Sequence, residues 1–159
     1  MPRYSYKGAL EVLKTYAQKE GYKDIDLAYH DTSMILYRIK KTPKIHIEPK
    51  YIRIEDYKDY EIKTYVFLHE LGHHELAKNW DKYRDRFPNV ALAEFHADVY
   101  KDYNYRRRKN YHVNNLEEEF MAWEKGLELG IKLGIRINMT KWWELKNKCV
   151  KSYIISLPL

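Results

Sequence analysis

The sequence has one cysteine and few glycines. Cys149 is the single thiol among 159 residues, so the chain forms no intramolecular disulfide and no zinc finger built on several cysteines. The six glycines follow no repeat, which excludes a collagen-like fibre. Hydrophobic residues make up 45% of the chain and charged residues 33%, which excludes a disordered protein. A chain of this length can build a core without cross-links.

Long apolar runs are also missing. A bilayer-spanning helix needs about 18 consecutive apolar residues, and the longest apolar stretches here are as short as Tyr65–Leu68. The first 21 residues carry charges throughout and lack the apolar segment of a secretory signal. The sequence therefore predicts a protein without membrane spans and with a cytoplasmic location.

The charge excess is small and evenly spread. Lysine and arginine number 29 against 23 acidic residues, and each third of the chain carries a slight positive excess. The one concentrated run is Arg106–Lys109. We interpret it as the solvated C-terminal end of a helix, where cations suit the helix dipole. The competing interpretation is a nucleic-acid surface in which Tyr103, Tyr105 and Tyr111 provide stacking rings.

The N-terminal third alternates between helical and strand patterns. Apolar residues at three-and-four spacing predict a helix over residues 5–20, which Gly21 ends. Residues 33–39 are rich in β-branched and aromatic side chains and predict a strand. Residues 44–48 alternate, as in a half-buried strand that Pro49 stops, and residues 51–54 add a third short strand.

Helical periodicity dominates from Glu61 onward. Ile62, Val66, His69, His73, Leu76 and Trp80 form one stripe along a helix of about five turns. Asn89 is a candidate N-cap for a second helix to about Tyr105, and Asn114 or Asn115 for a third that runs to about Leu129. The sequence predicts one α+β domain over residues 1–159, with a core at about 30–110 and a helical C-terminal extension at about 111–159.

The pattern H-E-x-x-H occurs within the first of these helices, as His69-Glu70-Leu71-Gly72-His73. Random shuffling of this composition gives only about 0.03 such matches. Residues four apart lie on one helix face, so His69 and His73 can bind one metal ion. Glu70 is rotated away from them, where it can reach a metal-bound water as a general base. The alternative interpretation is purely structural, with His69 and His73 as hydrogen-bonded histidines in the core.

A catalytic zinc site needs a third protein ligand. Glu94 and Asp98 share one face of the second predicted helix, so one can bind the ion while the other accepts a hydrogen bond from a ligand imidazole. We favour Glu94 as the ligand and Asp98 as the hydrogen-bonding partner. His96 is the competing ligand, but it points to a different face.

The H-E-L-G-H motif followed by Glu-x-x-Ala-Asp-x-Tyr resembles the gluzincin zinc metallopeptidases, and most of all the compact minigluzincins and the ImmA/IrrE-like proteins. The resemblance covers about Ile45 to Tyr100. It implies a small zincin-like fold with a short mixed sheet and one catalytic Zn²⁺ ion. It also implies that His69, His73 and Glu94 are ligands, that Glu70 is the general base, and that Asp98 supports a ligand.

The implied activity is that of a zinc metalloendopeptidase, a hydrolase acting on a peptide or protein. Glu70 would take the proton of the zinc-bound water and pass it to the leaving amine. An extended substrate would pair with the strand edge around Ile45–Ile47. Gluzincins usually add a downstream residue that stabilises the oxyanion. The sequence leaves four candidates for it, Tyr103, Tyr105, Tyr111 and His112.

Two further hypotheses concern regulation and a different role. The apolar end, Ile154–Leu159, or the thiolate of Cys149 could inhibit the enzyme by entering the cleft, although an ordinary packed end and an inert thiol are the simpler interpretations. Alternatively, the chain is a zinc-binding regulatory protein of the ImmA/IrrE type that acts by recognition. The sequence defines neither the substrate nor the oligomeric state.

Overall fold

The computed structural model describes residues 4–157, which form six α-helices, a three-stranded sheet and a short 3₁₀ turn. This confirms the predicted α+β class. The elements in chain order are α1 (Tyr6–Lys19), β1 (Asp24–Tyr29), β2 (Met34–Lys40), β3 (His46–Glu55), α2 (Tyr60–Ala77), α3 (Trp80–Arg86), α4 (Pro88–Tyr100), η1 (Asn104–Arg107), α5 (Lys109–Lys132) and α6 (Met139–Ile155).

The sheet is mixed, with β3 in the centre, β1 parallel to it and β2 antiparallel. The prediction of two strands separated by Pro49 was wrong, because β3 runs through this proline. Pro49 lies where the register of β2 shifts between Leu36 and Tyr37, and the pairing with β1 begins only at Tyr51. A proline is tolerated at such a bulge because its missing N–H is not needed there.

The first helix matches its predicted bounds closely. The Ser5 Oγ atom accepts a hydrogen bond from the Gly8 N–H and caps the N-terminus of α1. Leu10, Leu13 and Ala17 are buried on its inner face. Gly21 has a φ of +105°, a conformation that favours glycine and ends the helix.

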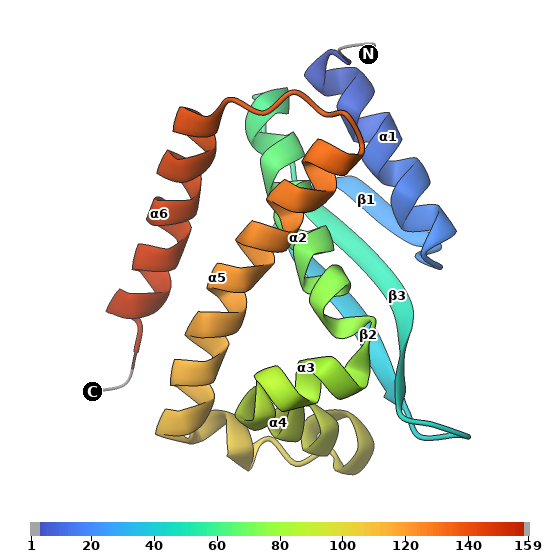
Figure 1. Cartoon of the computed structure of the whole chain (residues 1–159), viewed down its shortest axis with the longest axis vertical. Helices are drawn as coiled ribbons and strands as arrows, with labels where there is room; N and C mark the ends of the chain where they lie inside the picture. Colours follow the sequence, from blue (N-terminus) through green and yellow to red (C-terminus); the bar gives the residue numbers. More distant parts are fainter. Residues whose placement is uncertain (1–3, 158–159) are drawn as a thin grey trace.

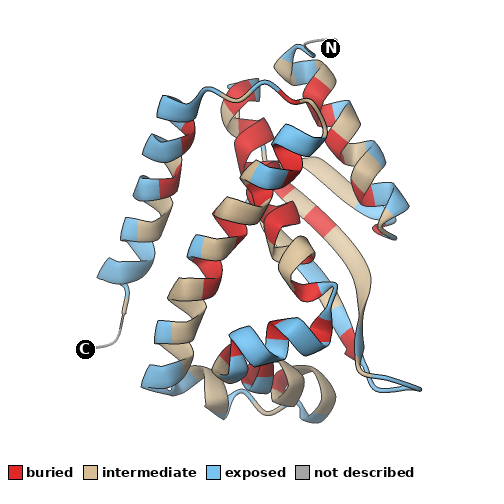
Figure 2. Cartoon of the chain, viewed as in Figure 1, coloured by how far each residue is buried: buried red, intermediate tan, exposed pale blue. Residues whose placement is uncertain are grey.

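The central helix α2 is buried on almost every side, not along one stripe as predicted (Figure 2). It is surrounded by α1, the sheet and α5. The predicted five-turn helix breaks after Ala77, because Asn79 caps a separate short helix, α3, by accepting a hydrogen bond from the Lys82 N–H. Trp80 therefore belongs to α3.

The next two helices start earlier than predicted. Phe87 is the N-cap of α4, in place of Asn89, and the helix ends at Tyr100, where Lys101 adopts a left-handed conformation. Helix α5 begins at Lys109 instead of Asn114 or Asn115. The glutamates at 117–119 consequently lie in the middle of α5, and not in a first turn.

Helices α2 and α5 cross at the centre of the molecule, and the sheet and α1 lie on one side of them (Figure 1). Helix α6 packs on the outside of α5, where only Trp142 and Lys146 of this helix are buried. Trp123, Leu129 and Trp142, all beyond residue 110, belong to the buried core cluster. No helix within residues 4–157 has both the length and the apolar character that a membrane crossing requires.

Candidate metal centre

His69 and His73 lie on the same face of α2, as their spacing predicts. Their Nε2 atoms are 3.2 Å apart, and the two rings meet edge to face. His69 is also stacked on Trp123 of α5, with ring centroids 4.4 Å apart and planes inclined by 17°. This stacking fixes the plane of the His69 ring and directs its Nε2 atom towards His73.

A carboxylate from α5 completes a set of three potential ligands. The Oε2 atom of Glu119 lies 3.2 Å from Nε2 of His69 and 3.5 Å from Nε2 of His73. Glu119 and His69 are buried, and His73 is nearly so. The three ligand atoms therefore converge from two helices on one enclosed point.

The spacing of these atoms suits a metal ion. A tetrahedral zinc ion with bonds of about 2.0–2.1 Å holds its ligand atoms about 3.3–3.4 Å apart. The three separations here are 3.2, 3.2 and 3.5 Å. Two imidazoles and one carboxylate also form one of the usual ligand sets of catalytic zinc.

Hydrogen bonding supports the same conclusion. Within the described chain, the buried Oε2 atom of Glu119 has no hydrogen bond, although it lies close to both imidazoles. A buried carboxylate oxygen that has ion-pair contacts but no hydrogen bond is incompletely satisfied. A cation between Glu119, His69 and His73 would satisfy this oxygen together with the two facing nitrogens.

Glu118, the neighbour of Glu119 on α5, holds the outer side of the His73 ring. Its Oε1 atom lies 2.8 Å from Nδ1 of His73. An Nδ1–H donated to this carboxylate leaves Nε2 of His73 free to bind a metal, and it raises the basicity of that nitrogen. Glu118 thus makes the carboxylate contact to an imidazole that was predicted for Asp98.

The electrostatics of the cluster reflect two buried carboxylates. Burial alone would lower the pKa of His73, but Glu118 and Glu119 raise it well above its usual value. Burial would raise the pKa of Glu119, yet His73 and His69 hold it well below the usual range. Burial lowers the pKa of His69 to about 4. The two carboxylates therefore favour a positive charge at this point, which is either a proton on His73 or a cation that displaces it, and His69 offers a neutral imidazole, as metal binding requires.

Glu70 lies beside this cluster and lines the same cavity. Glu70 is only 7% exposed, and this burial raises its pKa to about 7. The nearby Glu119 also raises the pKa, whereas His73 lowers it. A carboxyl group with a pKa near neutrality can both accept and donate a proton. This environment agrees with the general-base role predicted for Glu70.

The structure places Glu94, the ligand predicted from sequence, outside the group of converging ligand atoms. Both carboxylate oxygens of Glu94 accept hydrogen bonds from Arg106, at 3.1 and 2.9 Å. Glu94 lines the cavity, but it does not belong to the group of ligand atoms around the histidines. The competing candidate, His96, is packed against Tyr105 and lies outside that group as well.

Asp98, predicted to support a ligand imidazole, also lies apart from the two histidines, bonded to β2. Its Oδ2 atom accepts a hydrogen bond of 2.5 Å from the backbone N–H of Ile39 on β2. This bond ties α4 to the edge of the sheet. Neither ligand imidazole is hydrogen-bonded to Asp98, because Glu118 bonds to His73 and the Nδ1 atom of His69 has no partner among the described residues.

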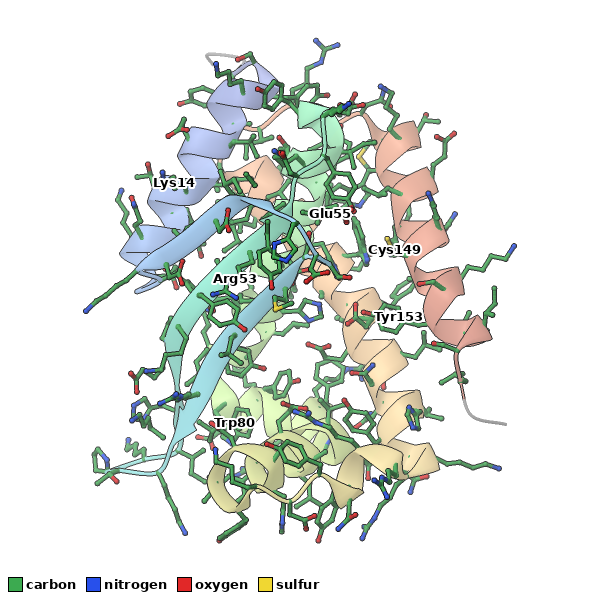
Figure 3. All side chains as sticks on the ribbon, turned by 180° about the vertical axis from the view of Figure 1, so that it is seen from behind. Lys14, Arg53, Glu55, Trp80, Cys149 and Tyr153 are labelled. Atoms are coloured by element: carbon green, nitrogen blue, oxygen red, sulfur yellow. The ribbon has the colours of Figure 1, made fainter. Side chains whose placement is uncertain are left out.

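The cavity that contains the cluster has a volume of about 290 Å³. Its walls are Ser33, the first part of β2 (residues 34–37) and residues from α2 to α6, including Tyr83, Val90 and Asn115. Tyr153 reaches the cavity from α6, beside Glu119, and Figure 3 shows it on the side of α6 that faces α5. Burial and the carboxylate of Glu119 raise the pKa of Tyr153.

The residues proposed from sequence for the oxyanion and for inhibition lie elsewhere. None of Tyr103, Tyr105, Tyr111 and His112 lines the cavity. Cys149 does not line it either, and burial raises the pKa of its thiol. Ile154 and Ile155 are exposed at the end of α6, whereas residues 158–159 of the predicted inhibitory tail lie outside the described residues.

Sequence analysis missed Glu118 and Glu119, although a signal for them exists. Glu119, Ala122, Gly126 and Leu129 follow one another at helical spacing, and all four are buried. Glu119 precedes Ala122 by three residues, so it lies on the same face of α5 as the apolar residues and is expected to be buried. A carboxylate on a buried helix face needs a positively charged partner.

A second group of possible ligand atoms comprises Glu20, His74 and Glu75. Its members already have partners. Nε2 of His74 lies 2.7 Å from Glu20, Nδ1 of His74 lies 3.0 Å from the Tyr22 hydroxyl, and Glu75 pairs with Tyr16 and Lys78. This network joins α1 to α2 and accounts for the buried His74 without a metal.

Comparison with protein-family models, with curated proteins and with solved structures finds no match to this chain. Function is therefore inferred from the geometry of the site.

Proposed function

We propose that this chain is a zinc-dependent peptidase with a gluzincin-like site, in which His69, His73 and Glu119 hold the metal ion. The observation that carries the proposal is the convergence of three ligand atoms at separations of 3.2–3.5 Å, one of them a buried oxygen without a hydrogen bond. The ligand set differs from the sequence prediction, in which Glu94 held the third position.

When bound, the ion would act as a Lewis acid that lowers the pKa of a water molecule and polarises a carbonyl group. Glu70, which lines the same cavity, would serve as the base that accepts a proton and returns it to the leaving amine. Its burial supports this role because a carboxyl group with a pKa of about 7 exchanges protons at neutral pH. Glu118 keeps the His73 ring in the orientation and tautomer that the site needs.

The shape of the cavity favours an extended peptide as substrate. β2 pairs with β3 on one side only, so its other edge is open, and residues 33–37 of this edge line the cavity. A peptide could add to this edge by main-chain hydrogen bonds and so cross the metal site. The sequence analysis placed this edge around Ile45–Ile47, but those residues belong to β3 or precede it.

Asp98 marks one end of the usable edge. Its carboxylate already accepts the N–H of Ile39, so this position of β2 is closed to a substrate. The open part of the edge therefore runs from Ser33 to about Tyr37, beside His69 and Glu70 in the cavity wall.

The proposal is tested by incubating the zinc-loaded protein with a diverse peptide mixture and reading new termini by mass spectrometry, with zinc content measured in parallel. We expect cleavage by the wild type, and at least a hundredfold slower cleavage by Glu70→Gln at unchanged zinc content. Glu128→Gln is the matched control. It changes an exposed glutamate of α5 that does not line the cavity, so this variant should cleave normally.

Equal cleavage by wild type and Glu70→Gln would contradict the role of Glu70. Stoichiometric zinc binding without cleavage of any peptide would contradict the peptidase proposal and favour a zinc-dependent binding protein. Failure to bind zinc or any other divalent ion would contradict both.

A further inference from the structure

The basic run Arg106–Lys109 lies where η1 ends and α5 begins. Arg106 and Arg107 form the last turn of the short η1, as the predicted C-terminal helix end requires. Arg108 is also the N-cap of α5 and Lys109 is its first residue, and no acidic side chain lies in that first turn. The N-terminus of a helix carries partial positive charge, so the cations at 108 and 109 are unfavourable there.

Most of this positive charge has no carboxylate partner among the described residues. Arg106 is neutralised by Glu94. Arg107, Arg108 and Lys109 are exposed and form no ion pair within residues 4–157, and Arg108 lies over the Tyr105 ring, 4.1 Å from its centroid. An external anion at this position would interact favourably with these three side chains and with the end of the helix.

Exposed aromatic rings lie next to these cations. Tyr100, at the end of α4, is 57% exposed, and Tyr103 is 54% exposed. Phe95 supports the ring of Tyr100 edge-on, with centroids 5.8 Å apart. Arg106 lies over one side of the Tyr103 ring, 5.4 Å from its centroid. Both rings are thus held by neighbours while much of their surface stays open.

We name the aromatic-basic surface by its members, Tyr100, Lys101, Tyr103, Arg107, Arg108 and Lys109. It occupies the segment that joins α4 to α5, at the bottom of the molecule in Figure 1. None of its residues lines the cavity of the metal cluster. Its function is therefore separable from the proposed peptidase activity and does not depend on it.

We propose that the aromatic-basic surface binds single-stranded nucleic acid. The cations would contact phosphates, and the two exposed tyrosine rings would stack on unpaired bases. Single strands fit better than a membrane, because the surface offers planar rings, and Val113 is the one exposed aliphatic side chain in the first turns of α5 beside it. They fit better than a duplex, because stacking requires unpaired bases.

Fluorescence anisotropy with a labelled 20-nucleotide oligothymidine tests this proposal. We expect the variant Arg107→Glu/Arg108→Glu/Lys109→Glu to bind at least tenfold more weakly than the wild type. The slope of log K against log salt should become shallower by about 0.7 for each phosphate that the variant no longer neutralises. The matched control replaces three exposed lysines in and near α1 by glutamate, Lys7, Lys19 and Lys23, and so changes the net charge by the same amount. The affinity of this control for the oligonucleotide should fall much less.

Stacking is tested separately by Tyr100→Ala and Tyr103→Ala, each of which should weaken binding about tenfold, whereas the Phe variants should retain it. Circular dichroism and thermal unfolding confirm that each variant is folded. Equal losses in the two charge-reversal variants would overturn the proposal, as would no measurable binding by the wild type at 50 mM salt. Binding to phosphatidylserine vesicles with no binding to oligothymidine would assign the surface to membranes instead and would likewise overturn it.

Discussion

Gly72 of α2 lies directly against the backbone carbonyl of Ala122 on α5. A Cβ atom added to Gly72 would come within 1.9 Å of the Ala122 carbonyl oxygen. The contact is reciprocal, because a Cβ on Gly126 would lie 2.4 Å from the carbonyl oxygen of Leu68. The two helices therefore touch backbone to backbone. This close crossing brings the glutamates of α5 to the histidines of α2.

The first prediction concerns this crossing. Gly72→Ala and Gly126→Ala should each destabilise the fold by about 2 kcal/mol or more, because rigid backbone must move to make room. Zinc affinity should fall as well, since the ligand atoms of α5 would be displaced from those of α2. Gly8→Ala is the control, because its added Cβ meets only ordinary contacts and should leave stability unchanged or slightly higher. Thermal unfolding and zinc titration measure both effects.

The second prediction distinguishes the two candidate ligands. Glu119→Gln should reduce zinc affinity by at least a hundredfold, because it removes a charged ligand. Glu94→Gln should retain zinc, because its carboxylate is bonded to Arg106 and not to the cluster. Competition with a chromogenic chelator gives both dissociation constants. The reverse result would restore the ligand set predicted from sequence.

The third prediction concerns the partner of His73. Glu118→Gln keeps the size of the side chain but removes its charge, so it should lower zinc affinity about 10- to 100-fold without abolishing binding. The Asp98→Asn variant, made at the position that sequence analysis favoured, should leave zinc affinity within a few fold of the wild type. Both constants come from the same chelator competition, and equal losses in the two variants would contradict the assignment.

The part of the proposed site on α2 could be predicted because the motif is local. His69, Glu70 and His73 lie within five residues, so helix geometry alone places them together. The carboxylate that joins the two histidines depends on which helix crosses α2, and that is decided by packing. Glu94 and Asp98 had suitable spacing on α4, but Gly72 and Gly126 fit each other and bring α5 closer instead.

In the sheet, too, the features that depend on local sequence could be predicted, whereas those that depend on strand pairing could not. β2 was found from its composition, and its bounds are nearly correct. β1 was missed, because Asp24, Asp26 and Ala28 have low strand propensity. This segment is a strand because it pairs with β3, which its own sequence does not reveal. Pro49 was expected to end a strand, whereas a bulge accommodates it. This bulge is visible only in the register between β3 and β2, and not in the sequence of β3 itself.

The fourth prediction is that zinc stabilises the fold. An ion that binds only the native state adds about 2.7 kcal/mol of stability at a concentration 100 times its Kd. For a chain of this size, chelation should therefore lower the Tm by roughly 5–10 °C. A His69→Ala/His73→Ala variant should show no such dependence on chelator. A chelator effect of equal size in that variant would place the stabilising ion elsewhere.

The fifth prediction concerns Tyr153, which reaches the cavity from α6 beside Glu119. Its high pKa keeps the phenol protonated, so it can donate a hydrogen bond to the oxygen on which negative charge develops as the peptide bond is attacked. Removal of one such donor costs about 10²–10³ in rate. If the chain is the proposed peptidase, Tyr153→Phe should lower kcat by about this factor and leave zinc affinity and KM nearly unchanged. Tyr111→Phe, outside the cavity wall, should be as active as the wild type, and an equal loss in both variants would count against a specific role for Tyr153.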